Sequence, residues 1–237
     1  MLKMLSSSLY YQFLIFFRIK SAFFFVGIFP LFLFLIFGFL WGADPSYIPF
    51  LLTGVIGMTI TSDGLYSIGP VIKEYHANGL IKYLKKMPFN VVAYFVSYIL
   101  SRVLSQFIVV IVLCLTSFLV FDYAVSPLFF IRMLSGVLIG LFIFGFLGIV
   151  LAFSGIKQIS NNSIVSIIGY TIIFTSNTFY PVSELNKVIE TIANVLPLNS
   201  ILGLMRGQTV DYINLTLWIF IPVIVFFILF KRLKFKR

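Results

Sequence analysis

The chain has 237 residues, of which 61% are hydrophobic and 10% are charged, and its mean hydropathy of +1.11 indicates an integral membrane protein, not a soluble domain. Its net charge of +10 does not indicate nucleic-acid binding, because the lysines and arginines flank apolar runs and do not line one polar face. With one cysteine, one histidine and no G-x-x-x-x-G-K-[ST] loop, the chain offers no intramolecular disulfide, no cysteine metal cluster and no P-loop for ATP.

The first 20 residues have the pattern of an interfacial helix. Apolar side chains recur there at three- and four-residue spacing: Leu2, Leu5, Leu9, Phe13 and Phe16. A signal peptide is the alternative, but the apolar run from Ala22 to Trp41 is too long for a typical signal. We predict that this run is the first membrane span, with a kink at Pro30.

Five further apolar runs predict five more spans. They extend from about Tyr47 to Val71, Val91 to Phe121, Leu128 to Phe153, Ser163 to Phe179 and Ile213 to Phe230. Most reach the roughly 20 residues that cross a bilayer as a helix, whereas the fifth run is short for a full crossing. Residues 42–46, 122–127 and 155–162 are predicted to be short loops. The predicted fold is a single all-α membrane domain, residues 1–237, with six transmembrane helices.

The segment from Lys73 to Asn90 is the longest polar and basic stretch, and it lies between the second and third spans. Read as a helix from about Glu74, it places apolar side chains on one face: Leu80, Ile81, Leu84 and Met87. Pro88 then ends the helix. Such a helix either rests on the lipid surface or contacts a partner protein, and the residues alone leave both alternatives open.

The basic residues also predict the orientation of the chain. Six spans place both termini on one side, and most of the basic residues gather on that side: Lys3, Arg18, Lys20, Lys73, Lys82, Lys85, Lys86, Lys157, Lys231, Arg232, Lys234, Lys236 and Arg237. The opposite side has Lys187 and Arg206, with Arg132 near its edge. Because positive charge favours the cytoplasmic side, we expect a multi-pass protein of a bacterial cell membrane with both termini in the cytoplasm.

Asp63 and Arg102 are ionisable residues inside predicted spans, where charge is costly and often functional. At helical rise they lie about 12 Å and about 16 Å from the cytoplasmic ends of their spans, so they are able to pair. This pair is a candidate structural contact or gate. The alternative is that Asp63 caps a helix break at residues 61–64 while Arg102 extends to the headgroups.

Residues 180–212 mix prolines and charges with helix-spaced apolar residues, and they predict one or two amphipathic helices at, or dipping into, the outer membrane face. The candidate residues of this extracellular re-entrant segment are Pro181, Glu184, Pro197 and Arg206. We interpret His76, the single histidine, as an exposed residue and not a metal ligand, because no second histidine or cysteine accompanies it.

This order of features resembles the membrane subunit of an ABC-2 type ABC transporter. In that family an interfacial helix precedes six spans. A cytoplasmic loop after the second span has a glutamate, then a glycine and basic residues, and it ends near a proline. The similar residues here are Glu74, Gly79, Lys82, Lys85, Lys86 and Pro88. The segment before the last span is similar too, with Pro181, Asn194, Pro197, Leu198 and Arg206 in the expected order. Val195 and Leu196 separate Asn194 from Pro197, so the family's usual Asn-Pro pair is absent.

The resemblance implies a permease that dimerises with the same or a homologous subunit and is driven by two copies of a separate P-loop ATPase. The loop helix, residues 73–90, would be the coupling helix. Its expected ATPase contacts are Glu74, Gly79, Leu80, Ile81 and Leu84. ATP and magnesium would bind to the partner, so this chain would bind no cofactor or metal and would not itself be an enzyme.

The implied activity is export of a hydrophobic or amphipathic cargo, such as a drug, a peptide or a lipid-like molecule. The thirty phenylalanines favour this cargo class, while export of a lipid-linked polysaccharide is the alternative within the family. A membrane scaffold or an embedded enzyme is the alternative outside it, and the scarcity of acids, histidine and cysteine in the spans disfavours the enzyme.

Overall fold

The computed structural model is built from helices. It describes residues 7, 9–14, 18, 20, 24–42, 44, 46–79, 91–154, 158–184 and 186–232. None of these residues forms a strand, and five of the described helices are long and apolar enough to cross a membrane. The prediction of an all-α multi-pass membrane protein is therefore confirmed.

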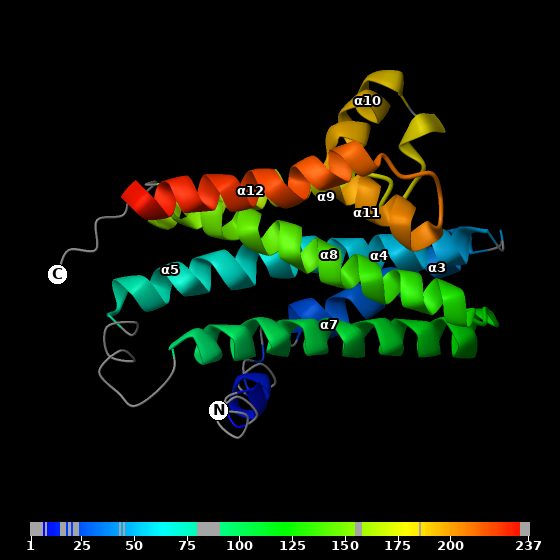
Figure 1. Ribbon diagram of the computed structural model, residues 1–237. Coiled ribbons are helices and arrows are strands. Elements are labelled where there is room, and N and C mark those ends of the chain that lie inside the picture. The colour runs from blue at the N-terminus through cyan, green and yellow to red at the C-terminus, as the bar shows by residue number, and fades with distance from the viewer. Residues whose placement is uncertain are drawn as a thin grey trace.

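The helices that correspond to the predicted spans lie roughly side by side (Figure 1). The first span consists of π-helix η1 (Phe24–Ile28) and α3 (Phe29–Trp41), and the second of α4 (Tyr47–Asp63), π-helix η2 (Gly64–Ile68) and α5 (Gly69–Ala77). The others are α7 (Val91–Phe121), α8 (Pro127–Ala152), α9 (Gln158–Thr175) and α12 (Tyr212–Arg232). In Figure 1 the ends of α5 and α12 and the start of α7 lie at one end of the bundle, and the α7–α8 connection lies at the other.

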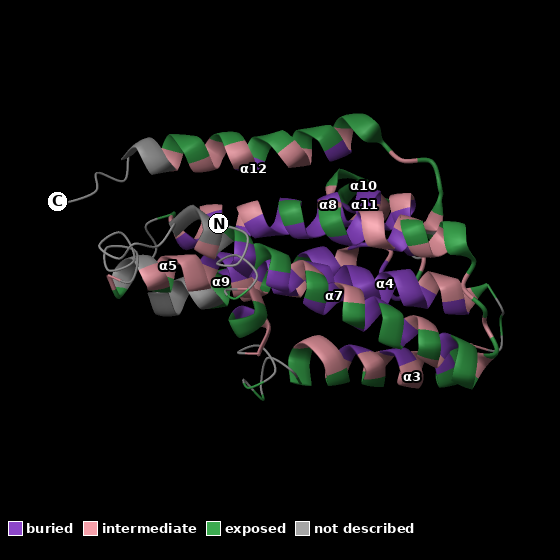
Figure 2. Ribbon diagram, turned by 60° about the horizontal axis from the view of Figure 1, so that its bottom comes forward, coloured by how far each residue is buried: buried purple, intermediate pink, exposed green. Residues whose placement is uncertain are grey.

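Helix α4 is the centre of the bundle. Nearly all of its residues are buried, and it packs against α3, α7, α8, α9 and α11. By contrast, few residues of α3 and α12 are buried, and much of the α12 ribbon is green in Figure 2. A helix that is apolar all round needs neighbours on every side or lipid on its free faces, so the pattern fits α4 inside the bundle and α12 at its rim.

The second span approaches α8 closely where glycines meet. Gly69 lies against Gly148 so closely that a Cβ atom on Gly69 would overlap the backbone of Gly148, and a Cβ on Gly148 would lie 2.7 Å from the carbonyl oxygen of Gly64. Small residues let membrane helices pack backbone to backbone. This contact holds η2 and the start of α5 against α8.

The predicted start of the loop helix near Glu74 is wrong, and its predicted end at Pro88 lies outside the described residues. Residues 73–77 belong to α5, which continues the second span beyond Val71 and ends at Ala77. Asn78 N–H still donates to the carbonyl of Glu74 (2.8 Å), and Gly79 follows with a φ of +72°. Glycine adopts this left-handed conformation without a Cβ penalty, which is why helices so often stop there.

The fifth span also differs from the prediction. Helix α9 begins at Gln158, inside the predicted loop 155–162, and ends at Thr175 instead of Phe179. Its apolar part is only residues 163–175. Hydropathy misplaced both ends. At the start, backbone hydrogen bonds continue the helix through polar residues. At the end, residues 176–180 are not helical although they include apolar side chains.

Two helices precede the last span, as predicted. After the short 3-10 helix η3 (Val182–Glu184) come α10 (Lys187–Val195) and α11 (Pro197–Arg206), which meet at a bend of 87°. The bend falls at Leu196, whose ψ of 142° is extended, because the residue before a proline is disfavoured in a helix. How deeply this pair enters the bilayer stays a prediction.

The predictions for the N-terminal region are tested only in part. Residues 9–14 are helical, but most of residues 1–23 lie outside the described part of the chain, so the interfacial position stays a prediction. Pro30 lies at the start of α3, directly after η1. Proline has no amide hydrogen and its ring crowds the preceding turn, which explains why the wider π-helix occurs at this point.

Candidate functional site

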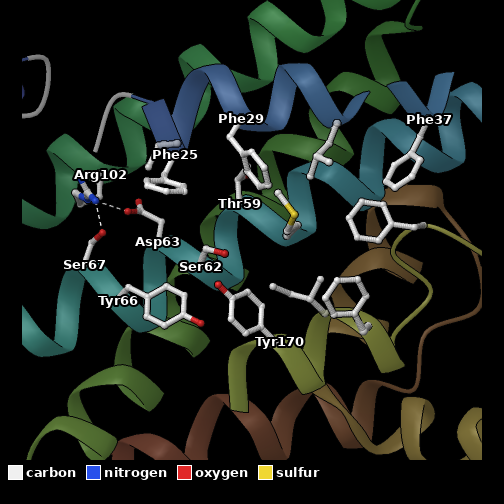
Figure 3. A pocket seen from close by; sticks show the side chains of 16 residues that line it. Phe25, Phe29, Phe37, Thr59, Ser62, Asp63, Tyr66, Ser67, Arg102 and Tyr170 are labelled. Atoms are coloured by element: carbon white, nitrogen blue, oxygen red, sulfur yellow. Dashed lines mark hydrogen bonds and ion pairs between the residues drawn. The ribbon is translucent and has the colours of Figure 1, made fainter. Parts of the chain in front are cut away.

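Asp63 and Arg102 form an ion pair inside the bundle. Arg102 Nη2, from α7, donates to Asp63 Oδ1 at the end of α4 and to Ser67 Oγ in η2 (Figure 3). The Asp63 side chain is 0% exposed and that of Arg102 is 8% exposed. The structure therefore brings together the two intramembrane residues that the sequence singled out.

Capping does not explain Asp63. Helix α4 passes directly into η2 after Asp63, and the Asp63 side chain makes no capping hydrogen bond. The carboxylate instead accepts from Arg102, while its other oxygen, Oδ2, is buried and has no hydrogen-bond partner among the described residues. π-Helices within longer helices frequently occur at functional sites, so the change in helix type beside Asp63 marks this region as a candidate site.

Polar residues extend the contact between α7 and the second span. Tyr98 Oη donates to the carbonyl oxygen of Ser67 (2.6 Å), and Thr59 Oγ1 donates to Gln106 Oε1 (3.0 Å). Tyr98 and Gln106 lie one helical turn on either side of Arg102, at four-residue spacing. Such spacing puts side chains on one helix face, and this signal would have identified both residues from the sequence.

A cavity of about 650 Å³ lies beside the ion pair. Its walls come from η1 and α3, from α4 and η2, from α9 and the residues after it, and from Arg102 of α7. Figure 3 shows Asp63, Arg102 and Ser67 gathered at one end of the group and Phe37 at the other, with Ser62, Tyr66 and Tyr170 between them. The cavity therefore changes from polar to apolar along its length.

The predicted coupling residues fall partly outside the described chain. Glu74 is exposed on the last turns of α5. Among the described residues, Gly79 has no neighbouring atom within 4 Å of the position where a Cβ would lie. Leu80, Ile81 and Leu84 lie outside the described residues. The ATPase contact therefore stays a prediction.

Arg206 holds the helix pair α10–α11 onto the bundle. Its Nε donates to Thr53 Oγ1 (2.8 Å), and its Nη2 donates to the carbonyl oxygens of Phe50 (3.0 Å) and Asn177 (2.7 Å). The guanidinium also lies 3.8 Å from the centre of the Phe50 ring, a favourable cation–π position. These contacts join α11 to α4 and to the end of the fifth span, a structural role that the sequence pattern did not reveal.

The other predicted residues of the outer segment do not gather into one site. Pro181 is half-buried before η3, Glu184 is exposed at its end, and Pro197 is buried at the first turn of α11. Prolines at helix starts supply a preset backbone and lose no hydrogen bond. We therefore assign Pro197 to the geometry of the bend.

The donor set of the described residues fits no metal centre. Among the described residues, no three His, Cys, Asp or Glu side chains lie close enough to hold a metal ion. The polar groups beside the cavity are an ion pair and hydroxyls, a combination that binds and orients polar groups.

Comparison with known proteins identifies the family. The family model described as ABC-2 type transporter matches residues 5–209, which is most of the chain. No curated protein matches it. Members of this family are membrane components of transporters, are typically not catalytic themselves, and normally work with an ATPase subunit. From this match and its membrane-spanning helices, we conclude that the chain belongs to the ABC-2 type transporter family as a permease.

Proposed function

We propose that this permease is one half of an ATP-driven exporter. Two permease subunits, identical or homologous, form the translocation path, and two copies of a separate P-loop ATPase supply ATP hydrolysis. The family match carries the proposal. The sequence has no P-loop of its own, so the nucleotide and its magnesium ion belong to the ATPase.

The arrangement of the helices supports the place of the ATPase. The end of α5, the start of α7, the end of α8 and the end of α12 lie at the same end of the bundle (Figure 1). Lys73 in α5 and Arg232 in α12 belong to this end, and positive charge favours the cytoplasmic side of a membrane protein. A cytoplasmic ATPase would contact the chain here.

The cavity supports the class of cargo. Phenylalanines form much of its wall, and a polar cluster lies at one end. A pocket of mostly apolar side chains with a few polar groups is the usual form of a small-molecule site. Hydrophobic or amphipathic molecules therefore fit this exporter better than a long polysaccharide.

Co-purification of the permease with its ATPase tests the proposal. The ATPase encoded beside the permease is co-expressed with it and should copurify with the parent chain. We expect Leu84→Asp to abolish the complex, because it places a charge on the predicted apolar contact face. The matched variant Lys85→Ala, one position away on the basic face, should retain it. A permease that purifies alone in all three forms would contradict the proposal.

A further inference from the structure

The cavity beside the ion pair has the dimensions of a ligand site. Its volume of about 650 Å³ lies within the roughly 300–1,000 Å³ of small-molecule pockets. The first span and α9 both pack against the second span, and the cavity lies where side chains of all three meet. Residues of this chain form the walls described here.

Three hydroxyl groups occupy the middle of the cavity. Ser62 comes from α4, Tyr66 from η2 and Tyr170 from α9, and Figure 3 shows their hydroxyl groups directed toward the same space. Tyr66 Oη has one long contact, 3.5 Å, to the carbonyl oxygen of Ser166. Hydroxyl groups both donate and accept hydrogen bonds, so this trio suits a polar head that does the same.

The charge of the polar end is internally balanced. Arg102 neutralises Asp63 directly, and both side chains are buried. A ligand with an ammonium or a sulfate group would lose its hydration here without gaining an unpaired counter-charge, and that loss is large in an apolar environment. An uncharged head avoids this cost.

Exposed aromatic residues show where a ligand enters. Phe25 is 64% exposed, Tyr170 is 58% exposed and Phe174 is 54% exposed, although all three line the cavity. They belong to the first span and to α9, so the cavity opens on the side of the bundle that faces lipid if the predicted spans cross the membrane. An amphiphile dissolved in the bilayer reaches the cavity without passing through water.

From these observations we infer that the cavity binds an uncharged amphiphile. Its hydroxyl- or amide-bearing head lies beside Ser62, Tyr66 and Tyr170, and its apolar body extends toward Phe37. The inference deepens the proposed function. It rests on that function only where it identifies the ligand with the transported cargo. Binding itself involves this chain alone.

Trp41 provides a reporter at the apolar end. Its indole is stacked on the Phe37 ring, with ring centroids 5.3 Å apart. The chain has two tryptophans, and Trp218→Phe leaves Trp41 as the single one. The probe is dodecyl glucoside brominated at the end of its chain, added to the permease in phosphatidylcholine nanodiscs. Bromine quenches a nearby indole, and unbrominated dodecyl glucoside serves as competitor.

We expect saturable quenching that the competitor reverses. The same brominated chain with a trimethylammonium or sulfate head should bind at least about tenfold more weakly, because its charge is desolvated without a partner. Tyr170→Phe removes one hydroxyl and should weaken glucoside binding about two- to tenfold. Tyr212→Phe, an equally conservative change on the exposed face of α12, should leave binding unchanged.

Quenching that never saturates, equal binding of charged heads, or equal weakening by Tyr170→Phe and Tyr212→Phe would each overturn the inference. Tyr170 is exposed, so its substitution keeps the bundle folded. The assay contains no ATPase and therefore separates the two proposals. Saturable binding by a permease that captures no ATPase would refute only the transport function, and ATPase capture without saturable binding would refute only this site.

Discussion

Removing one partner of the buried ion pair should destabilise the bundle. In Asp63→Asn, the Arg102 guanidinium stays charged and buried. It loses its contact with a carboxylate and keeps its hydrogen bond to Ser67. Breaking a buried pair costs about 3–5 kcal/mol in soluble proteins. Polar contacts in membranes contribute less, because the unfolded reference state also finds partners, so we expect about 3 kcal/mol.

The reverse variant and the double variant refine this prediction. Arg102→Gln leaves the Asp63 carboxylate, which is able to take up a proton, whereas a guanidinium is not; it should therefore cost less than Asp63→Asn. The double variant Asp63→Asn/Arg102→Gln leaves no buried charge. We expect its loss of stability to be at least about 2 kcal/mol smaller than the sum of the two single losses, as for other contacting pairs.

Unfolding in mixed micelles measures these differences. The permease is titrated with dodecyl sulfate, and the loss of helix is followed by circular dichroism for the parent, both single variants and the double variant. Lys187→Met, at an exposed position of α10, is the control and should change the unfolding free energy by less than about 0.5 kcal/mol. Losses that simply add would show that Asp63 and Arg102 do not stabilise each other.

Two further substitutions test the packing around α4. Gly54→Ala would place a Cβ 2.7 Å from the carbonyl carbon of Thr178 and should cost about 1–3 kcal/mol in the same titration. In the control Gly203→Ala, the Cβ would have no neighbour nearer than 3.6 Å, so this change should be neutral or stabilising. Equal effects of the two substitutions would refute the close approach of Gly54 to Thr178. Arg206→Gln removes charge-assisted hydrogen bonds and should cost about 2 kcal/mol. Limited proteolysis should then cleave the helix pair α10–α11 faster. An unchanged cleavage rate would show that Arg206 does not hold this pair.

The sequence alone identified the five helices that are long and apolar enough to cross a membrane, because the thickness of the hydrocarbon layer sets how many apolar residues a helix needs. It located α7 at Val91–Phe121, as the structure has it. It also anticipated one or two amphipathic helices before the last span, and the structure has two, with Pro197 at the start of the second. These features depend on local composition and on proline, which act through short stretches of chain.

Helix ends were less predictable than helices. The second span continues to Ala77 and the fifth begins at Gln158, in both cases through polar residues. A helix satisfies its backbone hydrogen bonds internally, whether its side chains are apolar or polar. Hydropathy therefore reports where the chain meets lipid and not where the helix stops.

Only the tertiary structure decided how the polar residues are arranged. Asp63 and Arg102, 39 residues apart, were recognisable as costly charges, but their contact depends on how α4 and α7 are rotated about their axes. Lipid is as apolar as a helix surface, so hydrophobic periodicity does not reveal which face of a span is inside. The cavity between the first span, the second span and α9, and the anchoring of α11 by Arg206, likewise arise from helix packing, which no single segment of the sequence contains.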